Sequence, residues 1–441
     1  MNRSKRLAWA KCALMCGLWN TVWAQPPGPP RQGTPPPTGA PLPGLSPSEL
    51  ARFQEGLRRF QEVVSVSGTE PATNGSGFGP RFNMNRCSGC HAAPAIGGSS
   101  PAANPQVAVA TEYGALNTIP SFIQSNGPVR VARFIHASDG SADGGVHSLF
   151  TVTGRLDAGT CSIAQPDFAT ALAQDNVSFR IPTPVFGAGL IEAIPDRTIL
   201  ANKAANSVAK QALGIAGHEN RSANDGGITR FGWKAQTRSL EIFSGEAYNV
   251  EMGVTNELFG SERDTTPGCS PNPLPEDRTN FDATSPVAAM SDIAAFSEFM
   301  RWLAPPQPQA GNASTAQGQQ IFNQIGCALC HTPVLNTGQT ASLALSNRPV
   351  VLFSDLLVHH MGTGLADGIG QGNAAADEFR SAPLWGLGQR IFLLHDGRTP
   401  DLVEAIKAHA SDGSEANAVV AAFSNLPDAA LQDLLAFLRS L

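Results

Sequence analysis

Apolar residues recur at helical spacing in three stretches of the chain, each of which predicts a helix. The first stretch begins after a capping box, Ser46 to Glu49, that carries proline at the first helical position. The second covers residues 317–325, and the third opens at Pro427-Asp428. The apolar faces of the first and third helices are Leu50, Phe53, Leu57, Phe60 and Val64, and Leu431, Leu434, Leu435 and Leu438.

Between Val129 and Phe179 apolar and polar residues alternate among Gly-rich turns, which predicts short strands. Overall, 44 glycines and 34 prolines among 441 residues predict many irregular loops. The formal net charge of −6 argues against a nucleic-acid-binding protein, which needs a basic face. No internal stretch is long and apolar enough to span a bilayer. We therefore expect a mainly α, loop-rich protein with no transmembrane segment in its mature form.

The first 24 residues have the pattern of a secretory signal peptide. A basic start with Arg3 and Lys5 precedes a short apolar stretch over residues 12–23, and Val22-Trp23-Ala24 fits a cleavage site. The alternative is an uncleaved anchor, but the apolar stretch is short and Asn20 interrupts it. We expect cleavage after residue 24 and a periplasmic or secreted protein.

The rest of the chain divides into a tether and two modules. Residues 25–45 are rich in proline and predict a disordered, extended tether. In each module a predicted helix precedes a Cys-x-x-Cys-His motif. We place the modules at residues 46–303 and 308–441, joined by a linker at residues 304–307, and the first is enlarged by insertions that hold the short strands.

The two Cys-x-x-Cys-His motifs are c-type haem attachment sites. In such a site two thiols bond to the vinyl groups of haem, and the adjacent histidine binds the iron. A single motif could instead be a redox dithiol or half of a zinc site. Two motifs in an exported chain favour two covalent haems, one in each of two cytochrome c-like domains. The residues concerned are Cys87, Cys90 and His91 in the first module, and Cys327, Cys330 and His331 in the second.

Two cysteines of the mature chain, Cys161 and Cys269, remain outside these motifs. Both lie in loop-like sequence of the first module. In an oxidising compartment a disulfide that staples a loop-rich domain is the favoured interpretation. A redox-active pair is the alternative.

Several segments give the chain a family resemblance. It resembles the di-haem oxidoreductases, a family of predicted peroxidases also labelled thiol oxidoreductase-like and related to bacterial di-haem cytochrome c peroxidase and MauG. With both haem motifs, the resemblance covers residues from about 80 to 441. The matching segments are FGAGLIEAIPD (186–196), RFGWKA (230–235), DLLVHHMG (355–362), FRSAPLWGLG (379–388) and LHDGR (394–398).

The resemblance implies a second ligand for the haem of the C-terminal module. In di-haem peroxidases this ligand lies fourteen residues after the histidine of a His-Asp-Gly turn, and counting from His395 leads to His409. The peroxidases have methionine at this position and MauG-like enzymes have tyrosine. Histidine would give bis-histidine ligation with His331 and a low-potential, low-spin haem. Rival ligands are His359, His360 and Met361, while His395 is expected to be a hydrogen-bonded turn residue.

The resemblance also implies a catalytic acid in the first module. The peroxidases carry an acid sixteen residues after an Arg-Ala or Lys-Ala step, which corresponds here to Glu251. A carboxylate near the iron can move protons during peroxide cleavage, and its pKa is expected to be raised by burial. A capping or surface glutamate is the alternative.

Electron transfer between the haems is expected to use an aromatic residue. The relay residue of the peroxidases corresponds to Phe231, and Trp233 lies two residues further on. Trp233 either takes the relay role or packs in the core. Arg380 and Arg398 are candidates to neutralise haem propionates, or else form ion pairs.

These inferences predict a periplasmic di-haem peroxidase-like oxidoreductase. Electrons would pass from a donor protein, a small cytochrome or a cupredoxin, to the C-terminal haem and then to peroxide or oxygen at the N-terminal haem. The resemblance further implies a calcium ion between the domains, held by backbone oxygens that the sequence does not identify. The alternatives are an electron-transfer cytochrome without substrate and a haem dioxygenase acting on an organic substrate.

Overall fold

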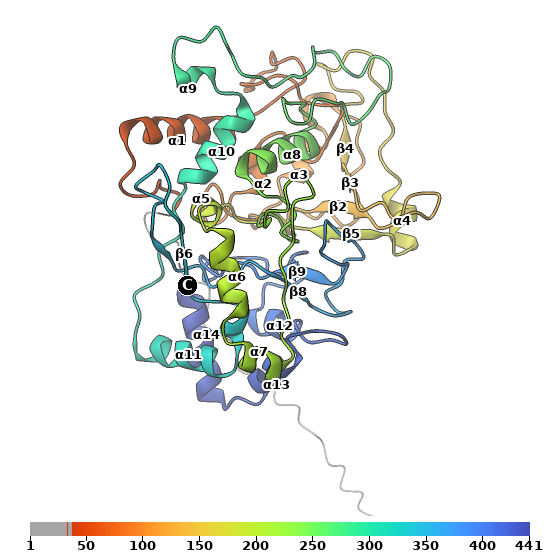
Figure 1. The fold of residues 1–441 in the computed structure, drawn as a ribbon. Coiled ribbons are helices and arrows are strands. Elements are labelled where there is room, and N and C mark those ends of the chain that lie inside the picture. The colour runs from red at the N-terminus through yellow and green to blue at the C-terminus, as the bar shows by residue number, and fades with distance from the viewer. Residues whose placement is uncertain (1–32, 34–37) are drawn as a thin grey trace, which may run out of the picture.

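The structure is a computed structural model that describes residue 33 and residues 38–441. The signal peptide expected over residues 1–24 and much of the tether lie outside the described residues. Within them, 14 α-helices and nine short strands are joined by long loops (Figure 1). The loop-rich, mainly α fold expected from the sequence is confirmed.

The first predicted helix is α1 (Pro47–Phe60), and Ser46 caps it through the expected box with Glu49. It packs on α10 (Asp292–Trp302), where Gly56 lies so close to α10 that an added Cβ would be 2.2 Å from the carbonyl oxygen of Ala295. The helix ends at Phe60, so Val64 is buried outside it and not on its apolar face.

A second helix pair, α11 (Ala313–Gln324) and α14 (Asp428–Ser440), repeats this arrangement. The four predicted leucines of α14 are all buried. Gly318 permits the close approach of the two helices, since an added Cβ would lie 2.0 Å from the carbonyl oxygen of Asp433. The α11 helix begins before residue 317 because the Asn312 side chain caps it by accepting a hydrogen bond from the Thr315 amide.

The other elements are short, apart from the 13-residue helix α8. The helices are α2 (Cys87–Cys90), α3 (Gln106–Val109), α4 (Phe168–Ala173), α5 (Ala188–Glu192), α6 (Asp196–Ala204), α7 (Ser207–Leu213), α8 (Leu240–Met252), α9 (Pro286–Ala289), α12 (Leu402–Lys407) and α13 (Asn417–Ser424). The antiparallel strand pairs are β1 (Arg81–Phe82) with β4 (Phe150–Thr151), β2 (Val131–Phe134) with β3 (Val146–His147) and β5 (Val177–Arg180), β6 (Leu335–Asn336) with β7 (Pro349–Val350), and β8 (Val358–His360) with β9 (Glu378–Arg380). Strands β2 to β5 lie in or next to the region where alternation predicted them.

The two halves of the chain exchange segments. Helices α6 and α7 leave the upper half and extend into the lower half, where Nδ2 of Asn202 in α6 donates to Oγ1 of Thr332 over 3.0 Å (Figure 1). Beyond α7, His218 forms a β-bridge with Val358. In the opposite direction, Leu335, Val350 and Leu352 pack in the hydrophobic core of the first half. Residues 304–307 thus separate the two halves in sequence, but each half contributes residues that pack against the other.

The end of the expected tether is ordered. The Leu42 amide donates to the carbonyl oxygen of Trp302 over 2.7 Å, and the Ala304 amide donates to that of Ala40 over 3.0 Å. The Leu42 side chain is buried in the core. The expectation of a disordered tether up to residue 45 is therefore wrong for residues 38–45, because they pair with the chain at the end of α10. In the described part of the chain, no helix is both long and apolar enough to cross a membrane.

Candidate functional site

The two Cys-x-x-Cys-His motifs line two different cavities. Cys87, Cys90 and His91 line the first cavity, which is bounded mainly by α8 and by β2 and β5. Cys327, Cys330 and His331 line the second, larger cavity, which is bounded by β8, β9, α12, α13 and α14. None of these four cysteines forms a disulfide, so the thiols remain available for attachment of a haem.

Three histidines are held in the same way. The Nδ1 of His91 donates to the carbonyl oxygen of Gly98, that of His331 donates to Phe353, and that of His409 donates to Ala405, over 3.0, 3.0 and 2.7 Å. A carbonyl oxygen can only accept, so Nδ1 carries the proton and Nε2 keeps its lone pair. A hydrogen bond from the ring nitrogen that does not bind the metal orients a histidine ligand. Burial lowers the pKa of His91 and His331 to about 4, which keeps both rings neutral as an iron ligand requires.

His409 lines the second cavity together with His331. Its rival His359 also lines this cavity, but its Nε2 and Nδ1 lie 3.1 and 2.8 Å from carboxylate oxygens of Asp355 and Glu415. Both ring nitrogens of His359 are therefore occupied. His360 is exposed and pairs with Asp377. Of His359, His360 and His409, only His409 both lines this cavity and has an Nε2 without a hydrogen-bond partner among the described residues.

His395 and Met361 complete the set of candidates at the second cavity, which both line. His395 lies in the predicted turn, and its carbonyl oxygen accepts from the Ile181 amide over 2.8 Å. Its ring stacks on Phe379 with the ring centroids 4.2 Å apart. The stacking and the burial of the His395 ring fit a side chain packed in the wall of the cavity.

Glu251 lines the first cavity from the last turn of α8. Its Oε2 accepts a hydrogen bond from Nδ2 of Asn83 over 2.8 Å. Burial raises the pKa of Glu251, and the Asn83 hydrogen bond and the nearby charges of Arg133 and Arg263 oppose the rise only in part. His91 is the one histidine among the described residues that line this cavity.

Trp233 lines both cavities. Its Nε1 donates to the carbonyl oxygen of Ile181 over 2.8 Å, which fixes the indole between them. Phe231 lines neither cavity. Its ring stacks on that of Phe243, with the ring centroids 6.0 Å apart. Both rings line a smaller pocket that shares lining residues with each of the two cavities. Trp233, and not Phe231, therefore lines the cavities of both motifs.

Arg380 and Arg390 line the second cavity and the smaller pocket beside it. Arg380 Nε donates to the carbonyl oxygen of Gly232 over 3.1 Å, but Arg380 Nη1 and Arg390 Nε are buried without a hydrogen-bond partner. Neither guanidinium forms an ion pair with another described residue, and burial lowers the pKa of both to about 10. Buried, unpaired donors of this kind fit the carboxylates at the edge of a haem.

Arg398 is placed elsewhere. Its Nε pairs with Asp396 over 2.7 Å, its Nη1 donates to the carbonyl oxygen of Gly364, and its side chain is exposed. It lines neither cavity. Of the two arginines expected to face a propionate, only Arg380 lies at a cavity.

Sequence reasoning missed Asn83, Arg133 and Arg390. Arg133 lines the first cavity from β2, and its Nε is buried without a partner. No spacing rule identifies these residues, because strand β2 and the loop after residue 388 come into contact with the cavities only through the fold. The one sequence signal was the lack of a nearby acid to pair with Arg390.

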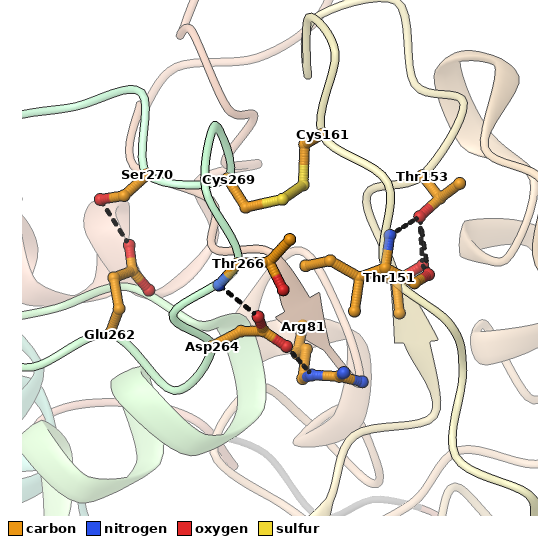
Figure 2. The surroundings of a disulfide bond; sticks show 10 residues. Arg81, Thr151, Thr153, Cys161, Glu262, Asp264, Thr266, Cys269 and Ser270 are labelled. Carbon is orange, nitrogen blue, oxygen red and sulfur yellow. Dashed lines mark hydrogen bonds and ion pairs between the residues drawn. A yellow bond between two sulfur atoms is a disulfide. The ribbon is translucent and has the colours of Figure 1, made fainter.

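Cys161 and Cys269 form a disulfide across 108 residues of sequence. Figure 2 shows it joining two loops, next to the ion pair between Arg81 and Asp264, and both cysteines are buried. Neither cysteine lines either cavity. This position fits a staple between loops better than a redox partner of the haem sites.

Comparison with known proteins shows which family this chain belongs to. No curated protein matches the chain. Among solved structures, the diheme peroxidase BthA from Burkholderia thailandensis E264 has 13% identity and a TM-score of 0.38, covering 95% of this chain and 94% of that one. A MauG-like protein associated with microbial copper homeostasis has 16% identity and a TM-score of 0.30, covering 59% and 90%. Similarities at these TM-scores are too weak to place any residue of this chain.

A protein-family model matches the sequence of this chain. The sequence model of the family described as "Di-haem oxidoreductase, putative peroxidase" matches residues 132–441, which is well over half of the chain. The match includes the second motif, Trp233, Glu251 and the segments that carried the resemblance. The chain therefore belongs to the di-haem oxidoreductase family and is an oxidoreductase enzyme.

Proposed function

We propose that this chain is a periplasmic di-haem c-type peroxidase, with one haem attached at Cys87 and Cys90 and the other at Cys327 and Cys330. The observation that carries the proposal is an asymmetry between the two cavities. The second offers a further imidazole, His409, with a free Nε2. The first offers a buried carboxylate, Glu251, and no further histidine among the described residues. The second site would hold iron through two imidazoles, whereas the first would hold it through one imidazole with a buried carboxylate close by.

A haem in the first cavity would supply the iron at which peroxide binds and is reduced. His91 would hold that iron through Nε2, because its Nδ1 is engaged with Gly98. Glu251 would accept the proton from the peroxide oxygen next to the iron and return it to the departing oxygen. Its raised pKa suits both tasks, since the group can change protonation state closer to neutral pH than an exposed glutamate.

Asn83 would position Glu251 for this exchange. Its amide occupies Oε2, so Oε1 is left to face the cavity. The Arg133 charge, with an unpaired Nε, would favour negative charge that develops on the departing oxygen. These contacts favour peroxide chemistry over a cytochrome that only carries electrons, because electron transfer alone has no use for a buried acid.

Electrons would enter at the second haem, held by His331 and His409, and reach the first by way of Trp233. A small cytochrome or a cupredoxin is the class of donor we propose. An indole can hold a transient radical, whereas a phenyl ring such as that of Phe231 does not do so readily. Arg380 and Arg390 would offset the negative propionates of the haem next to this relay.

The test is peroxide turnover by the holoprotein expressed with a cytochrome c maturation system. Denaturing electrophoresis with haem staining and intact mass should give two covalent haems per chain. Hydrogen peroxide added to the fully reduced protein should oxidise both haems, with water as the product. A protein that carries two haems but stays reduced in excess peroxide would contradict the proposal, and would favour the electron-transfer cytochrome.

A further inference from the structure

Lys234 is completely buried, with its ammonium inside a cage of oxygen atoms. The Nζ donates to the carbonyl oxygens of Ala375 and Glu378 over 2.8 Å and to that of Ala376 over 3.2 Å. The carboxylate oxygen Oδ1 of Asp367 is 3.2 Å from the same nitrogen. Four oxygens from one loop and from β9 thus surround a cation that belongs to the other half of the chain.

This donor set is typical of a metal site. Backbone carbonyls together with a carboxylate are the ligands that hard cations such as Ca²⁺ prefer. A buried ammonium is normally very costly unless each of its N–H groups finds an acceptor. Here every N–H has one, and the ring of Phe379, with its centroid 4.1 Å from Nζ, adds a cation–π contact.

The charge balance leaves no need for a second cation. Asp367 is shared with Arg180, whose Nη2 and Nε lie 2.6 and 3.0 Å from Oδ2. Although burial opposes it, the charges of Arg180 and Lys234 hold the pKa of Asp367 below its usual range. One carboxylate in contact with the ammonium therefore already faces two cations, and the charge of Asp377 is the other acidic influence on Lys234.

The cage lies between the two cavities. Lys234 follows Trp233 directly, Arg180 lines the first cavity, and Phe379 lines the second. In the part of the chain that the structure describes, no group of three or more His, Cys, Asp or Glu side chains could hold a metal ion. The oxygen cage between the cavities is occupied by the Lys234 ammonium, so a calcium ion could enter this cage only in place of that ammonium.

We propose that the Lys234 ammonium is a built-in substitute for a metal ion, joining the two halves of the chain through the oxygen cage of Asp367 and residues 375–378. The enzyme would then need no calcium to hold its haem domains together. This inference does not depend on the peroxidase proposal, because it is tested by metal content and thermal stability and not by turnover.

The first test uses the unmodified holoprotein. It is purified in buffer with calcium chloride, desalted and analysed for metals, and its melting temperature is then compared in EDTA and in calcium chloride. We expect far less than one calcium per chain and the same melting temperature in both buffers. One retained calcium per chain, with a lower melting temperature in EDTA, would overturn the proposal.

The second test removes the ammonium from the oxygen cage by substitution of Lys234. Lys234→Ala removes the ammonium and leaves room, whereas Lys234→Met removes the charge but still fills the space. In EDTA both variants should melt several degrees below the unmodified protein. Calcium chloride or n-propylammonium, supplied during folding, should raise the melting temperature of Lys234→Ala and not that of Lys234→Met.

The variants overturn the proposal if Lys234→Met is as stable as the unmodified protein, or if neither cation stabilises a folded Lys234→Ala. Should Lys234→Ala fail to fold in every buffer, the metal content and melting comparison of the unmodified protein still decide the question.

Discussion

The Nε1 of Trp233 donates to the carbonyl oxygen of Ile181, 2.8 Å away, and the amide of Ile181 donates to the carbonyl oxygen of His395, also 2.8 Å away. Ile181 lines the first cavity and His395 lines the second. This chain of two hydrogen bonds holds the indole at the junction of the cavities. Trp233, the relay residue that we propose, is therefore held in place between the two cavities by its hydrogen bond.

Replacing Trp233 by phenylalanine should slow electron transfer between the two haems. The ring would still fill much of the space, but it would lose both the hydrogen bond to Ile181 and an indole that can carry a radical. The rate at which the reduced second haem is oxidised after peroxide is mixed in gives the answer by stopped-flow absorbance. The matched control is Phe231→Leu, which should leave this rate nearly unchanged, and the reverse order of effects would assign the relay to Phe231.

Glu251→Gln should reduce kcat/KM for peroxide by roughly 10²–10⁴-fold, the usual contribution of a positioned acid–base group. The amide keeps an oxygen for the Asn83 hydrogen bond, so the loss reports proton transfer and not a broken structure. Glu246→Gln on the same helix, whose side chain also lines the cavity, should keep most of the activity. Equal losses in both variants would argue against a specific role for Glu251.

The pH profile follows from the direction of the Glu251 shift. Burial raises the pKa of Glu251, so its base form is lost as the pH falls through a value above the usual one for glutamate. The acid limb of kcat/KM should therefore lie above pH 4.5. Because the Glu246 charge also raises the pKa of Glu251, Glu246→Gln should move this limb to lower pH. If Glu246→Gln leaves the acid limb of kcat/KM unmoved, a group other than Glu251 is responsible for that limb.

His409→Ala should remove one of the two axial ligands of the second haem and convert it from a low-spin to a high-spin form, visible in the absorption spectrum. His409→Met should instead keep six ligands and raise the midpoint potential, because a thioether favours the reduced iron. His360→Gln is the control at an exposed rival and should alter neither property. A His409→Ala variant with an unchanged bis-histidine spectrum would return the role to another residue at this cavity.

Gly56→Ala tests the packing of the first half. The added Cβ would meet the Ala295 carbonyl oxygen at 2.2 Å and the Phe299 Cβ at 2.9 Å, so α1 and α10 would have to separate. We expect a loss of about 1–3 kcal/mol in unfolding free energy, as for other overpacked cores. Gln54→Ala on the exposed side of α1 should change stability by at most about 0.5 kcal/mol. Chemical denaturation of the holoproteins measures both.

Local signals in the sequence were sufficient for much of this fold. The capping box at Ser46 and the leucines of α14 predicted helices that the structure contains, because caps and 3.6-residue periodicity act within a few turns. The last residues of the tether were misjudged for the opposite reason. Composition predicts disorder from the segment alone, whereas Leu42 is ordered by pairing with Trp302, about 260 residues away in sequence.

Local sequence likewise predicted some residues of the candidate site but not others. Motif spacing predicted the cysteines and histidines that line the two cavities, and the family resemblance predicted His409, which lines the second cavity, since these depend on short stretches of chain. Arg390 and the cage around Lys234 could not be predicted, because their partners or cavities are assembled from segments far apart in sequence. Arg398 was predicted to lie near a haem because it belongs to a matching motif. In the structure its neighbour Asp396 holds it at the surface.

The most direct test of the account is the electron paramagnetic resonance spectrum of the oxidised holoprotein before and after hydrogen peroxide. We propose that the first haem would have an open side next to Glu251, whereas the second would be held by His331 and His409. We therefore expect one high-spin and one low-spin haem, with the high-spin signal lost on adding peroxide. Two low-spin haems that peroxide leaves unchanged would contradict it.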